Sequence, residues 1–162
     1  VDFILLTHGH GDHIGAVNLL KEKYNLQVYA SMKEKALLNN CITNLSKSIP
    51  PFKGIELEAD RWLCDNEKID FYGDTIVIME TPGHTDGSIC AFLGDIIFSG
   101  DTLFRMSIGR SDLPTGNTEE IINSVKKLFN LENDYRVLPG HGAESNLCFE
   151  KNNNPFMKNL NG

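Results

Sequence analysis

The chain contains 162 residues, of which 41% are hydrophobic and 23% are charged, and its 22 acidic and 15 basic side chains give a formal net charge of −7. These values are typical of one globular domain over residues 1–162 and exclude a disordered or fibrous protein. The acidic balance argues against a nucleic-acid partner, and no apolar run approaches the roughly 18 residues of a membrane helix, so we expect no membrane partner either.

The first part of the chain predicts strands that alternate with helices. Residues 3–6 are an unbroken apolar run, typical of a buried strand, and a polar segment with two glycines follows at residues 7–13. Apolar residues then recur at three- and four-residue spacing over residues 14–24, which predicts an amphipathic helix of about three turns. We expect a second strand at residues 27–30 and a second short helix at residues 32–38.

The middle of the chain predicts antiparallel β-structure. Residues 68–72 and 75–81 flank one Gly-Asp pair, and residues 88–93 and 96–99 flank another. A Gly-Asp pair between two apolar runs is a hairpin signal. The segment before these hairpins, residues 41–61, shows no pattern that assigns an element.

The last part predicts one long helix and one strand. A polar loop at residues 105–117 ends at Asn117, which with Glu120 resembles a capping box in front of an apolar helical face. We expect a last strand at residues 135–138 and, at the asparagine run 152–154, either a C-terminal cap or a fraying end.

The four cysteines are widely spaced and contain no C-x-x-C pair. They are Cys41, Cys64, Cys90 and Cys148. This spacing argues against a zinc ribbon and a dense disulfide framework and predicts free thiols in a reducing compartment. Since residues 1–30 also show no signal peptide, we expect a cytoplasmic protein.

All five histidines lie in loops that follow apolar, strand-like runs, and loops at strand ends are where functional groups gather. They are His8, His10, His13, His84 and His141. Imidazole nitrogens and carboxylate oxygens are the ligands that suit Zn²⁺, Mn²⁺ and Fe²⁺. The histidine pattern therefore indicates a metal site at strand ends.

The cluster His8-x-His10-x-Asp12-His13 is the strongest signal. His8 and His10 are two residues apart on an extended loop, so their side chains project to the same side and can chelate one ion. Asp12 and His13 begin the following helix and turn away from that pair, so they can bind a second ion nearby. One loop thus supplies half of two metal sites.

Three further residues complete the ligand set. Each metal needs ligands from elsewhere, and the remaining histidines are His84 and His141. Asp101 follows a strand pattern and a glycine, which suits a bridging carboxylate. Any one of these three residues alone is more often structural, but their occurrence together predicts a dinuclear metal site.

These motifs resemble the metallo-β-lactamase superfamily, with the closest likeness to its hydroxyacylglutathione hydrolase (glyoxalase II-like) branch. The motifs are Thr7-His8-x-His10-x-Asp12-His13, Pro82-Gly83-His84-Thr85, Gly100-Asp101-Thr102 and Pro139-Gly140-His141-Gly142. The resemblance implies an α/β (α+β) fold, an αββα sandwich with two mainly antiparallel sheets. Because the family normally carries several strands before its first metal motif and this chain starts at Val1, the resemblance also implies a domain that is partial at its N-terminus.

The resemblance also implies the role of each ligand. His8, His10 and His84 would hold the first metal, Asp12, His13 and His141 the second, and Asp101 would bridge the two. The cofactors would be two Zn²⁺ ions, with iron or manganese as alternatives, and Asp12 would also be catalytic because it orients the attacking hydroxide. Arg110, in a segment like one of this branch, would bind a substrate carboxylate.

We expect a metal-dependent hydrolase that cleaves a small-molecule thioester or ester through a metal-bridging hydroxide. Two other functions stay open. Gly109-Arg110-Ser111-Asp112 also resembles the mononuclear-iron persulfide dioxygenases of the superfamily, which are oxidoreductases. Alternatively, the chain is an inactive metal-binding fragment whose exposed strand edges make it a homodimer.

Overall fold

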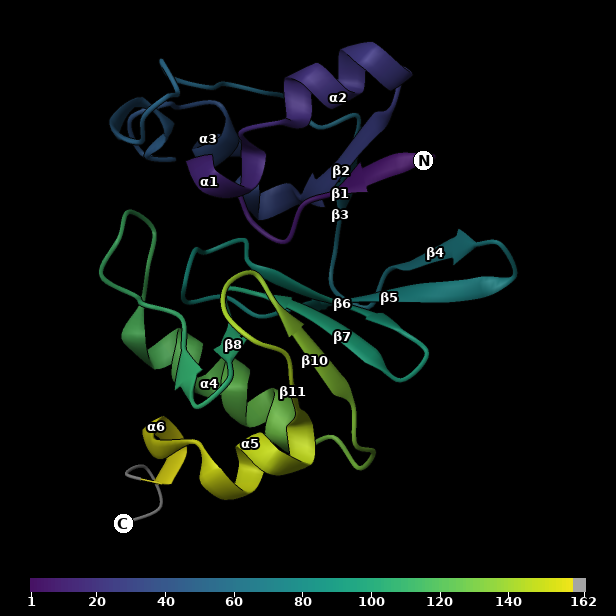
Figure 1. Ribbon diagram of the computed structural model, residues 1–162, viewed down its shortest axis with the longest axis vertical. Helices are drawn as coiled ribbons and strands as arrows, with labels where there is room; N and C mark the ends of the chain where they lie inside the picture. Colours follow the sequence, from purple (N-terminus) through teal and green to yellow (C-terminus); the bar gives the residue numbers. More distant parts are fainter. Residues whose placement is uncertain (159–162) are drawn as a thin grey trace.

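The computed structural model describes residues 1–158 as a sandwich of two sheets with helices on both outer faces (Figure 1). The smaller sheet has the order β1 (Phe3–Leu5), β2 (Gln27–Ser31) and β3 (Arg61–Leu63), and both of its pairings are parallel. Its outer face carries α1 (Gly11–Ile14), α2 (Val17–Tyr24), a 3₁₀ turn η1 (Met32–Glu34) and α3 (Lys35–Leu38). A second 3₁₀ turn, η2 (Ser46–Ser48), lies in the loop before β3.

The larger sheet has the strand order β11-β10-β7-β6-β5-β4. Its strands are β4 (Lys68–Phe71), β5 (Asp74–Glu80), β6 (Ile89–Leu93), β7 (Ile96–Gly100), β10 (Arg136–Pro139) and β11 (Ser145–Asn146). The pair β10–β7 is parallel and every other pairing is antiparallel. A separate small hairpin contains β8 (Leu103–Phe104) and β9 (Ser107–Ile108).

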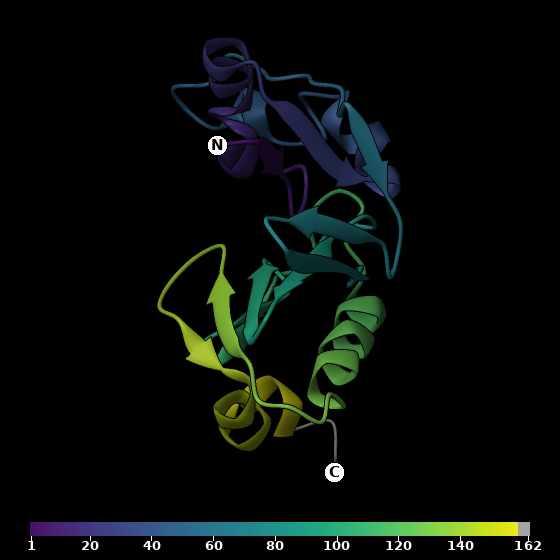
Figure 2. The same ribbon diagram turned by 90° about the vertical axis from the view of Figure 1, so that its right-hand side faces the viewer.

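Three helices cover the outer face of the larger sheet, at the opposite end of the molecule from α1–α3 (Figure 2). They are α4 (Thr118–Phe129), α5 (Leu147–Asn153) and α6 (Pro155–Lys158). Asn117 caps α4, since its side chain accepts hydrogen bonds from the backbone N–H groups of Glu119 and Glu120. Among the described residues, no helix has the length and apolar character needed to cross a membrane.

Three apolar clusters fill the spaces between the layers, and strand alternation assigns side chains to them. In β6, Ile89 and Ala91 pack in the cluster between the two sheets, whereas Cys90 points to the cluster under α4 and α5. In β2, Val28 and Ala30 face the helices of the smaller sheet. Both sheets are therefore apolar on two faces, which fixes the four-layer order.

Most of the predicted elements are present at the expected positions. The strand at residues 3–6, both hairpins, the capped helix after Asn117 and the last strand are confirmed, and all four cysteines are free thiols. The helix expected over residues 14–24 is interrupted, since α1 ends at Ile14 and α2 begins at Val17.

The pairing expected within the sheets needs one correction. Four of the five pairings of the larger sheet are antiparallel, but the smaller sheet is parallel throughout. The physical reason is its connections, because α1 and α2 carry the chain from the end of β1 back to the start of β2, which makes a βαβ unit. The short strands β3 and β8 are not predicted from the sequence, since neither stands in an apolar run or an alternating pattern of the length that marks the other strands.

The loop that contains His84 is packed tightly against the start of α4. Gly83 has a φ of +125°, and a Cβ at this position would lie 2.1 Å from the backbone nitrogen of Ile121 in α4. The Gly83 carbonyl also accepts a hydrogen bond of 2.9 Å from the backbone N–H of Asn117. A side chain at position 83 would therefore separate α4 from the loop.

We predict that Gly83→Ala lowers the free energy of unfolding by about 3 kcal/mol or more, because it adds a backbone clash to the strain of a positive φ. Gly94→Ala is the matched control, since Gly94 has a φ of +58° with nothing within 4 Å of the added Cβ, and it should cost about 1 kcal/mol. Urea unfolding of both variants tests this difference, and equal losses would contradict it.

Candidate metal centre

The strands explain why distant residues meet at one edge of the sandwich. Asp101 follows β7 and His141 follows β10, and these two strands are parallel neighbours. β5 runs in the same direction as β7, because each is antiparallel to β6, so the loop after β5 that contains His84 reaches the same edge. The loop after β1 faces this edge from the smaller sheet and adds its histidines and Asp12.

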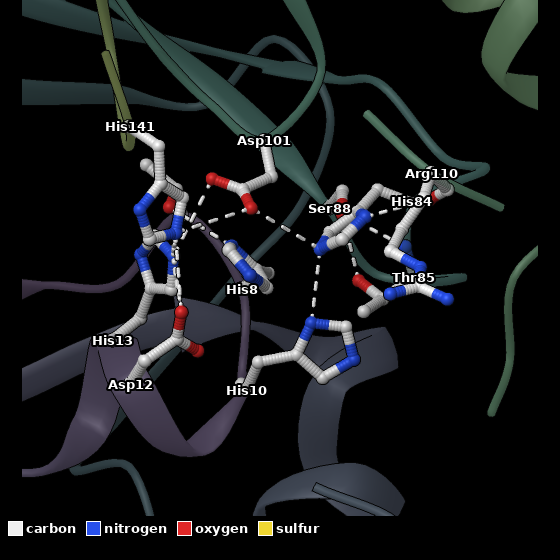
Figure 3. A network of polar contacts seen from close by, with 12 residues as sticks. His8, His10, Asp12, His13, His84, Thr85, Ser88, Asp101, Arg110 and His141 are labelled. Carbon is white, nitrogen blue, oxygen red and sulfur yellow. Dashed lines mark hydrogen bonds and ion pairs between the residues drawn. The ribbon is translucent and has the colours of Figure 1, made fainter. Parts of the chain in front are cut away.

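Three sets of ligand atoms converge here, and within each set all atoms lie within 4.8 Å of one another. The sets are His8, His10 and His84; His8, His13 and Asp101; and Asp12, His13 and His141. All seven metal ligands expected from the sequence are thus brought together (Figure 3).

The first set is buried. His8 is 0% exposed, and His10 and His84 are each 3% exposed. The Nδ1 atom of His10 lies 2.9 Å from the Nε2 atom of His84. Two further nitrogens, Nε2 of His8 and Nε2 of His10, are buried without a hydrogen-bond partner in the part of the chain that the structure describes, which is a costly state for a polar atom.

The second set is more open to solvent. The Nε2 atoms of His13 and His141 lie 3.2 Å apart, and the Nε2 atom of His141 lies 3.1 Å from Oδ2 of Asp12. The side chain of His141 is 56% exposed and that of Asp12 is 41% exposed. This set therefore faces the solvent side of the site.

Asp101 lies between the two histidine groups (Figure 3). Its Oδ1 is 3.4 Å from Nε2 of His13, and its Oδ2 is 3.5 Å from Nε2 of His84 and 3.6 Å from Nε2 of His141. Oδ1 is also buried without a hydrogen-bond partner among the described residues. The position is the one that a carboxylate shared by two ions requires.

The electrostatics keep the first set neutral. Burial lowers the pKa of His8 well below its usual range, with a further lowering from the neighbouring imidazoles, and burial lowers the pKa of His10 to about 4. Burial likewise lowers the pKa of His84. In contrast, although burial lowers the pKa of His13, the close contact with the charged carboxylate of Asp101 outweighs it and raises this pKa. Neutral imidazole is the form that binds metal ions.

A backbone contact orients the ring of His84. Its Nδ1 lies 2.7 Å from the carbonyl oxygen of Arg110, to which the Nδ1–H group donates. Donation from Nδ1 leaves the lone pair on Nε2, the atom that faces the other ligands. The segment around Arg110 therefore supports the first set through its backbone as well as lining the site.

The residues fit a divalent metal ion. Imidazole nitrogens and carboxylate oxygens converge on shared points, and this donor set matches the preferences of zinc, iron and manganese. A bound cation would satisfy the unpaired atoms of His8 and Asp101, whereas His10 faces His84 with its Nδ1 and turns its unpaired Nε2 away from the other ligands (Figure 3).

A cavity of about 440 Å³ opens over these ligands. Besides ligand residues it is lined by Arg110, by Ser107 and by apolar side chains, namely Leu45, Ile49, Phe104, Ile108 and Leu113. The sequence did not predict Leu45 and Ile49 as lining residues, because their segment has no periodic pattern. The cavity thus combines a polar floor with apolar walls.

Arg110 lies at the cavity and is paired with a neighbour. Its Nε and Nη2 donate to the two carboxylate oxygens of Asp112 at 2.7 and 2.8 Å. This pair holds the pKa of the Asp112 carboxyl at about 2. The sequence assigns Asp112 no role of its own, so the ion pair is a finding of the structure.

Most of the chain matches one known protein family. Residues 1–141 match the family model of the Metallo-beta-lactamase superfamily. The chain belongs to the metallo-β-lactamase superfamily. The resemblance and the fold expected from the motifs are confirmed, and the superfamily fold implies divalent-metal binding, which the histidine cluster fits.

Three similar proteins place the chain within the superfamily. A probable metallo-hydrolase of Streptococcus pyogenes is 39% identical over 95% of this chain and 69% of its own length. The hydroxyacylglutathione hydrolase GloC of Haemophilus influenzae is 34% identical over 95% of this chain and 74% of its own length. The crystal structure of TTHA1623 in a di-iron-bound form has a TM-score of 0.84 and 34% identity, and the match covers 95% of this chain and 76% of that one. Superfamily relatives thus support a metal-dependent hydrolase.

We predict that the purified protein binds two divalent ions per chain and that His141→Ala binds one, because the buried first set survives the loss of an exposed ligand. Asp86→Asn is the control, since Asp86 is an acidic residue two positions from His84 that belongs to none of the ligand sets, and it should retain both ions. Elemental analysis after dialysis measures the stoichiometry. Two ions in His141→Ala would contradict the assignment of His141.

Proposed function

We propose that this chain is a dinuclear-metal hydrolase that cleaves thioesters, with a preference similar to that of a hydroxyacylglutathione hydrolase. The observation that carries the proposal is the Asp101 carboxylate, which lies within 3.6 Å of ring nitrogens from both histidine groups at the floor of a cavity of about 440 Å³. The similarity to GloC supports the substrate class.

The proposed ligand assignment follows the geometry. The first ion is held by His8, His10 and His84, the second by Asp12, His13 and His141, and Asp101 serves both. When bound, the two ions supply a water molecule of lowered pKa as nucleophile and a Lewis acid for the substrate carbonyl. We propose Zn²⁺, and the di-iron form of TTHA1623 makes iron the main alternative.

Asp12 is the proposed catalytic carboxylate. Its Oδ2 contacts His141, its side chain is partly exposed, and it lines the cavity over the ligands. From this position the carboxylate orients the attacking water toward the substrate carbonyl. Asp12 is therefore both a ligand and a group that touches the reacting atoms.

The histidine inventory favours thioesters over oxygen esters. All five histidines of the chain belong to the ligand sets, so no imidazole is left to protonate a leaving group. When the acyl carbon–sulfur bond breaks, the sulfur departs as a thiolate, which is stable because a thiol has a pKa of about 8.5. An alkoxide is far more basic and needs a general acid.

Arg110 is the proposed binding residue for a substrate carboxylate. Both members of its ion pair with Asp112 are largely exposed, with side-chain exposures of 63% and 69%. An exposed pair of this kind contributes little to stability, so a substrate carboxylate can replace Asp112 at little cost. The planar guanidinium then forms the same bidentate contact with the substrate.

The alternative of a mononuclear-iron dioxygenase uses fewer of these residues. A single ion in the first set would leave Asp12, His13 and His141 together without a metal. The two functions differ in their use of oxygen, since a dioxygenase consumes oxygen with glutathione persulfide and a hydrolase does not. Oxygen uptake by the metal-loaded protein would favour the alternative.

We predict that the metal-loaded protein hydrolyses S-lactoylglutathione or another acyl thioester, and that Asp12→Ala and His84→Ala each lower kcat/KM by more than about 100-fold. The reason is that each is a ligand, and loss of a group behind a ligand already costs about 10–100-fold. A thiol-release assay over a panel of thioesters measures this. Near-wild-type turnover in either variant would contradict the assignment.

We further predict that Arg110→Ala raises KM for a thioester with a free carboxylate about tenfold and leaves kcat nearly unchanged, because a charge-assisted contact is lost. Arg105→Ala is the matched control. Arg105 contacts Glu144 and the ring of Phe149 and does not line the cavity, so its KM should not change. Equal effects of the two variants would remove Arg110 from the site.

A further inference from the structure

Glu34 is a buried carboxylate that contacts two metal-ligand loops. It lies in η1, directly after β2, and is 0% exposed. Its Oε2 accepts a hydrogen bond of 2.7 Å from the backbone N–H of Gly9, and its Oε1 accepts one of 2.6 Å from the hydroxyl of Thr85. Each oxygen of the Glu34 carboxylate therefore accepts a hydrogen bond from a different loop.

The two contacted residues are neighbours of the first ligand set. Gly9 lies between His8 and His10, and Thr85 follows His84. Each of the three proposed ligands of the first ion is thus adjacent in sequence to a residue that donates a hydrogen bond to the Glu34 carboxylate. Among the contacts of the described residues, Glu34 has none with Asp12, His13 or His141.

The surrounding chain is shaped to admit this carboxylate. A Cβ at Gly9 would lie 2.8 Å from Oε2 of Glu34, and a Cβ at Gly87 would lie 2.5 Å from its Oε1. The hydroxyl of Thr85 also lies 2.7 Å from that of Ser88, whose oxygen accepts a 3.1 Å hydrogen bond from the Thr85 backbone N–H (Figure 3). The loop after β5 is therefore held around Glu34 by several contacts.

The energetics of Glu34 argue against a role in stability alone. Burial raises the pKa of its carboxyl to about 7, since the cost of removing the charge from water exceeds the gain from its hydrogen bonds. No salt bridge with Glu34 occurs among residues 1–158. A buried charge without a neighbouring cation is a poor source of stability. Glu34 is instead placed to fix the distance between two loops, because its carboxylate contacts both of them.

We propose that Glu34 is a positioning residue, which holds the loop of His8 and His10 at a fixed distance from the loop of His84 and so sets the affinity of the first metal ion selectively. The inference rests on the proposed two-ion assignment. It extends that assignment to a residue that contacts no ion and no substrate.

A second buried glutamate provides the matched control. Glu150 is also 0% exposed, and its carboxylate accepts hydrogen bonds from the Met106 backbone N–H, the Asn154 amide and the Ser145 hydroxyl. These contacts fasten the β8–β9 hairpin to α5 and reach neither of the loops that Glu34 joins. Glu150→Gln therefore reports what the loss of a buried carboxylate does to the fold in general.

The test measures Zn²⁺ dissociation constants in two single-site backgrounds. His141→Ala retains the first ligand set and His84→Ala retains the second. Glu34→Gln preserves volume but places an amide N–H₂ against one of the two donors, so it should raise the dissociation constant about 10–100-fold in the His141→Ala background. In the His84→Ala background the change should stay below about threefold, the scatter expected for an uncoupled site. Competition with a chromophoric chelator at fixed pH gives both constants.

Folding is checked separately for every variant by circular dichroism. Thr85→Val removes one of the two donors while the carboxylate stays, so it should raise the dissociation constant in the same background by a smaller factor than Glu34→Gln, and it keeps the inference testable if Glu34→Gln does not fold. Glu150→Gln should change neither constant.

Three outcomes would overturn the inference. An unchanged Zn²⁺ affinity of folded Glu34→Gln and Thr85→Val in the His141→Ala background would show that Glu34 positions nothing. Equal weakening in both backgrounds would show a general effect on the fold. If the two backgrounds themselves bind no Zn²⁺ while remaining folded, the ligand assignment fails, and the inference fails with it.

Discussion

Four loops, which follow four different strands, meet at the carboxylate of Asp101. Its oxygens lie 3.4–3.6 Å from ring nitrogens of His13, His84 and His141. Those histidines follow β1, β5 and β10, while Asp101 itself follows β7. The distances around Asp101 therefore depend on how the two sheets are placed relative to each other. A displacement of about 1 Å in any of these strands would move a ligand out of position.

The site is assembled against an energetic cost that the apolar layers offset. Within residues 1–158, three polar atoms, in His8, His10 and Asp101, are buried without hydrogen-bond partners, and each such atom costs on the order of 1–3 kcal/mol. The three apolar clusters between the layers provide the opposing stabilisation. A bound cation would turn the unpaired atoms of His8 and Asp101 from a cost into ligands, which would couple metal binding to folding.

Charge is distributed unevenly across the site, and this divides its two halves. Burial keeps the imidazoles of His8, His10 and His84 neutral, whereas Asp101 raises the pKa of His13. The buried half is suited to holding an ion tightly, and the exposed half with Asp12 and His141 opens to the cavity. This division is the physical basis for assigning a buried ion to one half, and a more exposed ion with the proposed catalytic Asp12 to the other.

Local chemistry explains which features could be predicted from the sequence. The metal motifs, the Gly-Asp hairpins and the Asn117 cap depend on residues close together in the chain, and the structure contains the elements and contacts expected from them. Glu34 could not be found in this way, since a glutamate in a helix-forming stretch resembles a solvated one until Gly9 and Gly87, far along the chain, enclose it. The parallel pairing of the smaller sheet depends likewise on a tertiary crossover.

The two-ion site is tested by anomalous diffraction from crystals of the zinc-loaded protein, recorded on both sides of the zinc absorption edge. The assignment predicts two anomalous peaks about 3.5–4 Å apart, one among His8, His10 and His84 and one among Asp12, His13 and His141, with the Asp101 carboxylate between them. A single peak, or peaks away from these residues, would contradict it.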